Sequence, residues 1–242
     1  MTREEFILEC KKIFELNSLP LTEEQAEKLF LLTERMLEVN KSLNLTAIKE
    51  EKAIILKHYA DSVTISQHIP DNSRVMDLGC GAGFPTLPLA IFRPDLSITA
   101  LDGTAKRINY VSETAKALKL SGVTAIAARA EETANDKKYR ESYDVVTARA
   151  VASLPVLCEL CLPFVKVGGL MIAMKAQQAD EELSSALNCI SLCGGEVVES
   201  LSCDLKSESG ETDSRKLIFI KKIKKTPQPY PRHYSKISKK PL

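Results

Sequence analysis

A cluster of glycines in the first half of the chain is the feature best suited to do chemistry. The segment from Asp77 to Pro85 places Gly79, Gly81 and Gly83 between a predicted strand and a predicted helix. Glycine allows a backbone to turn tightly and to approach a ligand with no Cβ in the way. A dinucleotide fingerprint would need another glycine where this chain has Phe84, so the spacing speaks against a nicotinamide dinucleotide.

A carboxylate at the end of the next strand strengthens the prediction of a nucleoside site. Asp102 lies 25 residues after Asp77, and a carboxylate there can accept hydrogen bonds from both ribose hydroxyls while repelling a 2′-phosphate. The alternative is that Asp102 caps the helix that begins near Thr104. Ala130 and Glu131 end the third strand, where an adenine ring would lie, although a solvated helix start explains them nearly as well.

These residues require a scaffold in which strands and helices alternate. Apolar periodicity predicts strands at 74–78, 97–102, 123–128, 144–147, 169–174, about 195–203 and 215–222, and helices at 85–92, 104–119, 153–164 and 178–190. Such alternation favours an α/β fold with a mostly parallel sheet that is covered on both faces and binds ligands beyond the carboxyl ends of its strands. The last two strands flank a polar loop at 206–214 and are expected to pair as a hairpin.

The chain is expected to have three parts. No glycine precedes Gly79, and residues 1–72 have the spacing of helices at 3–16, from 22 onwards and at about 50–67. The second of these helices opens with a capping-box pattern, Thr22-Glu-Glu-Gln25. We therefore expect a helical extension at 1–72, a ligand-binding domain at 73–222 and a basic tail at 223–242.

The net charge of +1 hides a strong asymmetry along the chain. Ten of the 33 basic residues and none of the 32 acidic residues lie in 214–242, so residues 1–213 carry 23 basic and 32 acidic residues, a net charge of −9. A terminal block of like charge is typical of a solubilising tail or of an arm that binds a polyanion. Tyr230, Arg232, His233 and Tyr234 lie among the lysines of this block, and aromatic side chains between cations suit single-stranded RNA. The RNA contacts expected in the tail are Tyr230, Arg232, Lys239 and Lys240.

Composition excludes several classes of protein. The chain is 44% hydrophobic, yet no apolar run approaches the roughly 20 residues that a membrane span needs, and the first residues lack the apolar core of a signal peptide. We therefore expect a cytoplasmic protein. The seven cysteines are odd in number, which argues against a disulfide framework. The pair Cys158 and Cys161 has neither a second pair nor nearby histidines, so no metal site is expected.

In combination, several segments resemble those of one methyltransferase family. They are Asn44-Leu-Thr-Ala-Ile48, Lys57-His-Tyr-Ala-Asp61-Ser62, the Asp77 to Pro85 loop, Leu101-Asp-Gly-Thr-Ala-Lys-Arg107, Thr147-Ala-Arg-Ala150, Ser153-Leu154, Lys175-Ala176, Tyr230-Pro-Arg232 and Lys239-Lys-Pro-Leu242. The chain resembles class I S-adenosylmethionine-dependent methyltransferases. Within them it is most similar to the 16S ribosomal RNA guanine-N7 methyltransferase family once called glucose-inhibited division protein B. It departs from that family at Thr86 and Ala176, where many members have glycine, and in the tail between Arg232 and Lys239.

The resemblance implies a fold, a cofactor and a partner. The fold is Rossmann-like with a helical extension, the cofactor is S-adenosylmethionine, and the partner of a monomeric enzyme is 16S ribosomal RNA or the small ribosomal subunit. His58 enters as an RNA contact only through the resemblance. The implied cofactor positions are Gly79, Phe84, Asp102, Ala130, Glu131 and Arg149, with Asp77, Gly81 and Gly83 completing the turn.

The candidate catalytic residues are Arg149 and Lys175, which end the fourth and fifth strands. Guanine N7 has a free lone pair and carries no proton, so holding it in line with the methyl group could supply most of the acceleration. We expect Arg149 to position cofactor and base, the alternative being a salt bridge to Asp77 or Glu131. Lys175 would meet an RNA phosphate or a base oxygen, or it is an ordinary surface lysine.

Three rival functions remain open from the sequence. They are a nicotinamide dehydrogenase, an RNA-binding module on an inactive methyltransferase fold, and a methyltransferase of small molecules. Phe84 speaks against the first, and the intact glycine turn with Asp102 speaks against the second. The third would leave the basic tail without a purpose.

Overall fold

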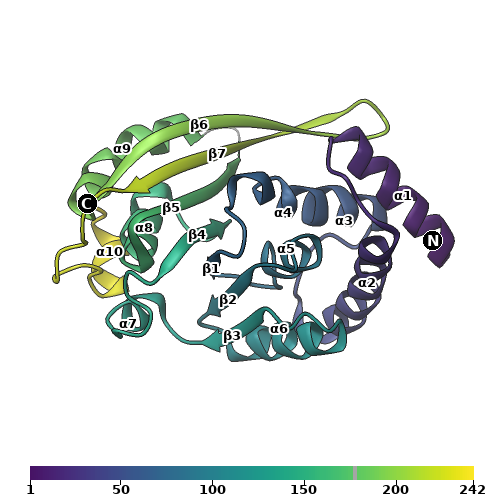
Figure 1. Ribbon diagram of the computed structural model, residues 1–242, viewed down its shortest axis with the longest axis horizontal. Coiled ribbons are helices and arrows are strands. Elements are labelled where there is room, and N and C mark those ends of the chain that lie inside the picture. Colours follow the sequence, from purple (N-terminus) through teal and green to yellow (C-terminus); the bar gives the residue numbers. More distant parts are fainter. Residues whose placement is uncertain (177–178) are drawn as a thin grey trace.

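A single seven-stranded sheet organises the molecule, for which a computed structural model describes residues 1–176 and 179–242 (Figure 1). The strand order is β3-β2-β1-β4-β5-β7-β6, and in this part of the chain β7 alone runs in the direction opposite to the other six strands. This confirms the predicted α/β class with a mostly parallel sheet. The strands are β1 (Arg74–Leu78), β2 (Ser97–Asp102), β3 (Val123–Ala127), β4 (Tyr143–Arg149), β5 (Val165–Ala176), β6 (Gly195–Lys206) and β7 (Thr212–Lys222).

Helices cover both faces of the sheet and give the molecule two apolar cores. Successive residues of a strand point to opposite faces, so Val75 joins the core under α5 and α6 whereas Met76 joins the core under α8 and α9. The N-terminal helices share the first of these cores with the sheet. The helices are α1 (Arg3–Leu16), α2 (Glu23–Leu43), α3 (Glu51–Ile54), α4 (Asp61–Val63), α5 (Thr86–Phe92), α6 (Ala105–Ala117), α7 (Ala130–Thr133), α8 (Leu154–Cys161), α9 (Ala179–Leu192) and α10 (Tyr234–Lys239).

The N-terminal helices form largely as predicted, with one exception that matters for the site. Capping boxes start both α1, at Thr2, and α2, at Thr22. The third predicted helix, 50–67, is instead a composite of α3, a π-helical turn at Ile55–Ala60, α4 and a 3₁₀ turn at Ser66–His68. Single π turns inside helices are frequent at functional sites because they redirect side chains and free backbone groups.

The hairpin of β6 and β7 is longer than the sequence predicts and crosses the molecule. Its turn occupies only 207–211, and the two strands run to α1 at the far end of the fold (Figure 1). There the Asn17 amide donates to the Lys206 carbonyl at 3.0 Å, and the Lys206 N–H donates to Asn17 Oδ1 at 2.8 Å. The hairpin thus ties the helical extension to the sheet.

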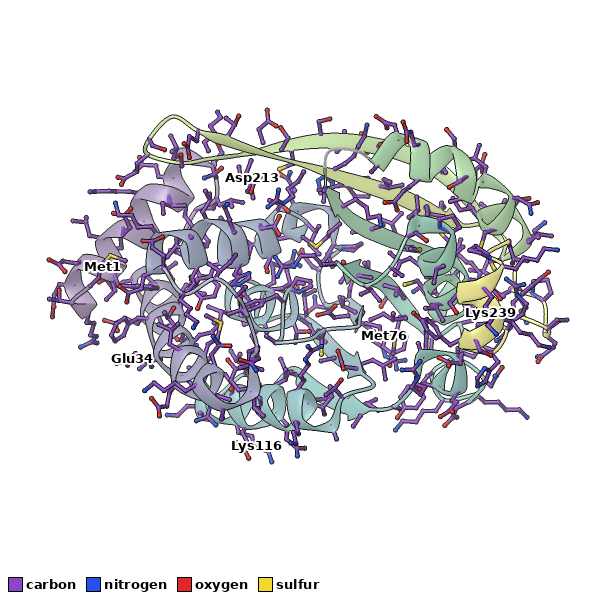
Figure 2. The ribbon with its side chains drawn as sticks, turned by 180° about the vertical axis from the view of Figure 1, so that it is seen from behind. Met1, Glu34, Met76, Lys116, Asp213 and Lys239 are labelled. Atoms are coloured by element: carbon purple, nitrogen blue, oxygen red, sulfur yellow. The ribbon has the colours of Figure 1, made fainter. Side chains whose placement is uncertain are left out.

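The C-terminal residues 223–242 pack against the fold instead of extending as a free arm. Ile237 of α10 is fully buried, and Arg232 forms an ion pair with Glu159 of α8, whose side chain is 0% exposed. Lys222 is buried just before the tail and donates to the Leu162 carbonyl. The sequence predicted a solvated basic tail. In the structure, part of this segment is buried and forms an ion pair within the fold. Lys239 nevertheless lies on the surface, at the end of the molecule opposite Met1 (Figure 2).

The composition led to expectations about the cysteines and about membrane-spanning helices. All seven cysteines are free thiols; six are buried and Cys203 is half-buried. No helix in the described part of the chain has the length and hydrophobicity that crossing a bilayer would demand.

Candidate active site

The glycine turn forms a cradle between β1 and α5. Gly79, Gly81 and Gly83 have φ angles of 74°, 55° and 86°, a region that side chains disfavour. A Cβ on Gly79 would lie 2.5 Å from Val151 Cγ2, and one on Gly83 would lie 2.6 Å from Leu87 Cδ1. At Gly81 the nearest atom would be a backbone oxygen at 4.0 Å, so this position opens into free space. The turn therefore combines two tightly packed glycines with one that leaves room for a ligand.

Asp102 lies at the end of β2, and its carboxylate is hydrogen-bonded to the backbone of the glycine turn. Its Oδ2 accepts a hydrogen bond from the Gly81 N–H at 3.1 Å, and its Oδ1 accepts one from the Thr104 N–H at 2.7 Å. The N-cap position of α6 is Thr104, so Asp102 is not the helix cap that the sequence left as an alternative. Its half-buried carboxylate is placed beside the glycine turn, where a ribose would meet it.

Asp77 lies beneath the cradle and is almost completely buried. Its Oδ2 accepts hydrogen bonds from the Thr86 amide at 3.1 Å and the Thr86 hydroxyl at 2.6 Å, whereas its Oδ1 is buried and has no partner among the described residues. Burial raises the pKa of this carboxyl to about 6. A buried acceptor with no partner is costly in a finished site, so the cradle fits a polar ligand group that would satisfy Oδ1.

A pocket of about 1210 Å³ opens beside the cradle. It exceeds the usual volume for one small ligand, roughly 300–1,000 Å³, and so has room for a nucleoside cofactor together with a base. Six predicted site residues line this pocket, from the glycine turn, the π turn and the ends of β4 and β5. They are His58, Gly79, Gly81, Phe84, Arg149 and Lys175.

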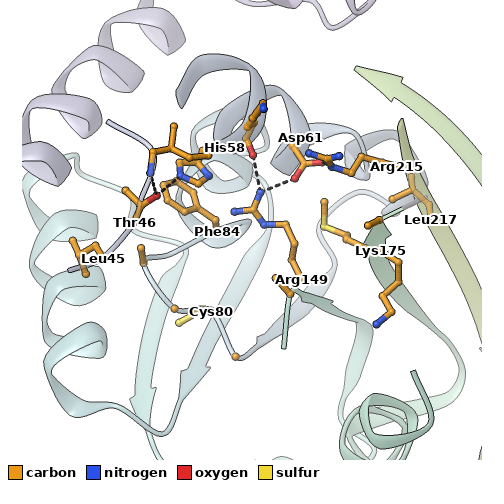
Figure 3. Close-up of a pocket in the computed structure, with 18 of the residues that line it drawn as sticks. Leu45, Thr46, His58, Asp61, Cys80, Phe84, Arg149, Lys175, Arg215 and Leu217 are labelled. Atoms are coloured by element: carbon orange, nitrogen blue, oxygen red, sulfur yellow. Dashed lines mark hydrogen bonds and ion pairs between the residues drawn. The ribbon is translucent and has the colours of Figure 1, made fainter. Parts of the chain in front are cut away.

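Arg149, at the end of β4, occupies the centre of the pocket wall (Figure 3). Its Nη1 donates to Asp61 Oδ2 at 2.6 Å and to the Lys57 carbonyl at 3.1 Å. Its guanidinium carbon lies 5.4 Å from the centre of the Phe84 ring, within cation–π range. The salt bridge expected as an alternative role is thus present, but its partner is Asp61 instead of Asp77 or Glu131.

His58 and Phe84 form a flat aromatic wall of the pocket. Their ring centres are 4.4 Å apart with an interplanar angle of 12°. The Nε2 of His58 lies 2.8 Å from the Thr46 hydroxyl, and its Nδ1 is buried with no partner in residues 1–176 and 179–242. Burial, together with the charge of Arg149, lowers the pKa of His58 to about 4. The imidazole is therefore neutral at physiological pH.

Lys175, at the end of β5, is held more firmly than a surface lysine. Its ammonium donates to the Ala152 carbonyl at 2.8 Å and pairs with Glu182 at 2.7 Å. Glu182 also accepts the Leu154 N–H at 2.7 Å, which joins the starts of α8 and α9 to this side of the pocket. Lys175 lines the pocket with the Glu182 carboxylate beside it, and its contact with a substrate stays a prediction.

The remaining predicted residues lie outside the pocket lining. Ala130 and Glu131 begin α7, and the buried Glu131 carboxylate lies 3.7 Å from Arg129 Nε. Glu131 is therefore not simply a solvated helix start.

The tail residues are divided between packing and the surface. Both Arg232 and Tyr230 are engaged by the fold: Arg232 donates to Glu159 at 2.7–2.9 Å, and the Tyr230 carbonyl accepts from Arg140 at 3.0 Å. Arg232 thus has a structural partner in Glu159, and its contact with RNA stays a prediction. Lys239 and Lys240 are exposed, and their contact with RNA stays a prediction.

Sequence reasoning missed Asp61, the acidic partner of Arg149, and Arg215, the second arginine that pairs with Asp61. Asp61 and Arg215 both line the pocket, yet neither was a candidate. Asp61 stood within a recognised motif, and its spacing from His58, one helical turn away, was the available signal. Arg215 was counted only as part of the basic block, because nothing local marks the strand position that faces the pocket.

Comparisons with known proteins agree on one family. The family model described as rRNA small subunit methyltransferase G matches residues 25–211. Similar curated relatives carry the name Ribosomal RNA small subunit methyltransferase G. That of Alkaliphilus oremlandii is 43% identical over 93% of this chain and 94% of its own length, and that of Lactobacillus acidophilus is 40% identical over 100% of both. That of Acetivibrio thermocellus is 44% identical over 92% of this chain and 90% of its own.

Solved structures of distant sequence share the fold. M. jannaschii TYW2 in complex with AdoMet aligns with a TM-score of 0.52 at 17% identity, covering 67% of this chain and 77% of that one. A SAM-dependent methyltransferase from Methanosarcina mazei aligns with a TM-score of 0.50 at 14% identity, covering 66% of this chain and 96% of that one. These likenesses concern the sheet and its helices. The matching family model and the relatives that are about 40% identical over most of the chain lead to one conclusion: the chain belongs to the rRNA small subunit methyltransferase G family.

Proposed function

We propose that this protein transfers a methyl group from S-adenosylmethionine to N7 of a guanine in 16S ribosomal RNA, acting in the cytoplasm as a monomer. The observation that carries the proposal is the meeting of the glycine cradle and Arg149 in one pocket large enough for cofactor and base. Family membership supports the reaction and the class of RNA.

The cofactor would lie along the edge of the sheet where β1, β2 and β4 end. The Gly79 to Gly83 turn would hold its methionine part, Asp102 its ribose, and Ala130 with Glu131 its adenine. The unpartnered Oδ1 of Asp77 is an acceptor directly beneath this path. When bound, S-adenosylmethionine supplies a methyl group on a cationic sulfur, and its transfer leaves a neutral thioether.

The pocket suits an acceptor atom that needs no deprotonation. His58 is a weak base because its pKa is about 4, and Asp61 is engaged by two arginines. Neither of these two side chains is therefore poised as a general base near neutral pH. Guanine N7 accepts a methyl through its lone pair with no proton to remove. The chain's task is then to hold the base against the Phe84 and His58 wall and to exclude water.

Arg149 and Lys175 would orient the two reactants. In the described structure Arg149 uses only Nη1, so its Nε and Nη2 remain as donors toward a ligand. Lys175 would reach a base oxygen or a phosphate from the opposite side. The exposed Lys239 and Lys240, with half-buried Tyr230, would contact RNA outside the pocket.

Methyl transfer to ribosomal RNA tests the proposal directly. Tritiated S-adenosylmethionine is offered with naked 16S RNA and with small subunits, and the modified base is then mapped. Label on a guanine N7 is the expected result; its absence from both substrates contradicts the proposal. A thermal shift with S-adenosylmethionine but not with NAD would separate the enzyme from a dehydrogenase, since a ligand at about 100 times its Kd stabilises by about 2.7 kcal/mol.

A further inference from the structure

Asp61 connects two arginines that reach the pocket from distant parts of the chain. Its Oδ2 lies 2.6 Å from Arg149 Nη1, and its Oδ1 lies 3.1 Å from Arg215 Nε. The Asp61 side chain is only 5% exposed, and all three residues line the same pocket (Figure 3). A carboxylate this well buried and doubly paired fixes the direction of both guanidinium groups.

The π turn provides a second hydrogen-bond acceptor for Arg149, the backbone carbonyl of Lys57. In an α-helix the Asp61 N–H would donate to the Lys57 carbonyl, but here it donates to the carbonyls of Leu56 and His58. The Lys57 carbonyl accepts from Arg149 Nη1 instead. Both contacts use the same nitrogen, so the guanidinium is anchored at one corner while its other donors face the pocket.

The same cluster balances charge at the pocket wall. Arg149 and Arg215 bring two positive charges, and Asp61 brings the negative charge that they share. Asp213 pairs with Arg215 and is not among the described residues that line the pocket. With Asp61 ionised, the two aspartates balance the charges of the two arginines, and the ammonium of Lys57 lies 3.9 Å from Asp213 at the edge of this cluster. Without that charge, an uncompensated guanidinium would face the ligand.

We propose that Asp61 is a positioning residue that sets the preference of the pocket for the cationic methyl donor over its neutral product. The inference rests on the proposed cofactor. S-adenosylmethionine carries a positive sulfur, whereas S-adenosylhomocysteine carries an uncharged one, and the two differ by little else. An Arg149 guanidinium whose charge Asp61 does not balance would repel the cationic S-adenosylmethionine but not the neutral S-adenosylhomocysteine. Asp61 therefore limits product inhibition as well as orienting Arg149.

Binding of the two ligands to Asp61→Asn, without RNA, tests the inference. The substitution keeps the size of the side chain and removes its charge. Like charges a few ångströms apart repel appreciably at the effective dielectric of a partly buried site. We expect the ratio of the Kd for S-adenosylmethionine to the Kd for S-adenosylhomocysteine, measured by calorimetry on the full chain, to rise about tenfold or more.

Matched variants separate this effect from a general loss of structure. Asp213→Asn removes the carboxylate on the outer side of Arg215, and the ratio should stay within about twofold of wild type, because a charge farther away is better screened. Asp61→Glu retains the charge and should retain most of the ratio. The double variant Asp61→Asn with Arg149→Gln removes one charge of each sign, so its ratio should return toward wild type even where both affinities fall.

The outcomes distinguish the inference from the proposed function. An equal loss of affinity for both ligands in Asp61→Asn, with wild-type folding by circular dichroism, overturns the inference and leaves the function standing. A wild-type protein that binds neither ligand overturns the proposed function itself. If Asp61→Asn alone does not fold, Asp61→Glu and the double variant decide: both should keep a ratio near that of the wild type, and a ratio raised about tenfold in either of them contradicts the charge argument.

Discussion

Asp77 is a single side chain placed for binding at a cost in stability. In the unfolded chain it ionises near its ordinary value of 3.8, whereas burial raises the pKa of the folded carboxyl to about 6. The folded state thus holds the proton more tightly than the unfolded state. The contribution of this carboxyl to stability is full below pH 4 and is lost as the pH rises through about 6.

Replacing Asp77 by Asn should show how much stability the buried carboxylate costs. The amide oxygen can still accept from Thr86, and no charge need be buried. We expect the ligand-free variant to unfold with a free energy higher by about 1–3 kcal/mol at pH 7.5, with the difference vanishing near pH 4. S-adenosylmethionine should bind more weakly, because the free acceptor is lost. Urea unfolding at both pH values and calorimetry check this; a variant less stable than wild type at pH 7.5 contradicts it.

Arg149→Ala should separate positioning from folding. Asp61 keeps its second partner, Arg215, so the carboxylate is not left unpaired and the fold should persist. The donors that face the pocket disappear, and we expect methyl transfer to fall at least about tenfold, the loss typical of one well-placed orienting contact. Arg74→Ala, an arginine at the other end of a neighbouring strand, is the matched control. Unchanged single-turnover rates in Arg149→Ala would refute the assignment.

At the residue level, the sequence predicted those site residues whose place depends only on a nearby strand. The glycine turn follows β1, and Asp102 and Arg149 end β2 and β4, so residue type and spacing predicted that they would meet at one edge of the sheet. Asp61 lies 88 residues from Arg149 along the chain. Its pairing depends on how a π turn packs against β4 and β7, which no local pattern contains.

The tail is the element whose charge was most misleading. Ten cations and no acids suggested a solvated arm, yet Arg232 turns inward to Glu159, and Lys222 is buried. A buried carboxylate on α8 has to be paired, and its partner comes from a segment some 70 residues later. Hydrophobic periodicity predicted most strands and helices, because each buries one face. It could not predict where a terminal segment would dock.

Arg232→Ala should therefore destabilise the protein more than a surface arginine would. It leaves Glu159 buried without its ion pair, and losing one partner of such a pair typically costs about 3–5 kcal/mol; with Arg232 partly exposed, we expect about 2–3 kcal/mol. Adding Glu159→Gln should recover much of the loss. Chemical denaturation measures both variants. Equal stability of Arg232→Ala and wild type would mean that the tail does not need this pair.

At the scale of the whole molecule, basic groups available to RNA are spread between the pocket and the tail. Arg107, Lys57 and Lys175 lie around the pocket, while Lys239 and Lys240 are exposed at the end of the chain. The body of the protein is acidic overall, with a net charge of −9 over residues 1–213. Non-specific contact with RNA should therefore favour these cations and the other exposed lysines of the C-terminal segment, Lys221, Lys224, Lys225 and Lys236, whereas the acidic remainder should repel RNA.

The salt dependence of RNA binding measures how many of these cations act. Contact with about four phosphates of single-stranded RNA gives a plot of log K against log salt with a slope near −3. Deleting the tail would confuse charge with stability, since Ile237 and Arg232 hold it to the fold. The variant Lys239→Gln with Lys240→Gln avoids this, and should flatten the slope by about 1.4.

Lys116→Gln is the control for that measurement. Lys116 is exposed in the last turn of α6, and a helix that follows a parallel strand runs back toward the opposite edge of the sheet from the ligand site. Its loss should leave the slope unchanged while lowering the net charge like any other lysine. If Lys116→Gln flattens the slope as much per charge as the tail variant does, attraction by overall charge explains RNA binding. If only the tail variant does so, the exposed end of α10 contacts RNA while its buried side holds the segment in place.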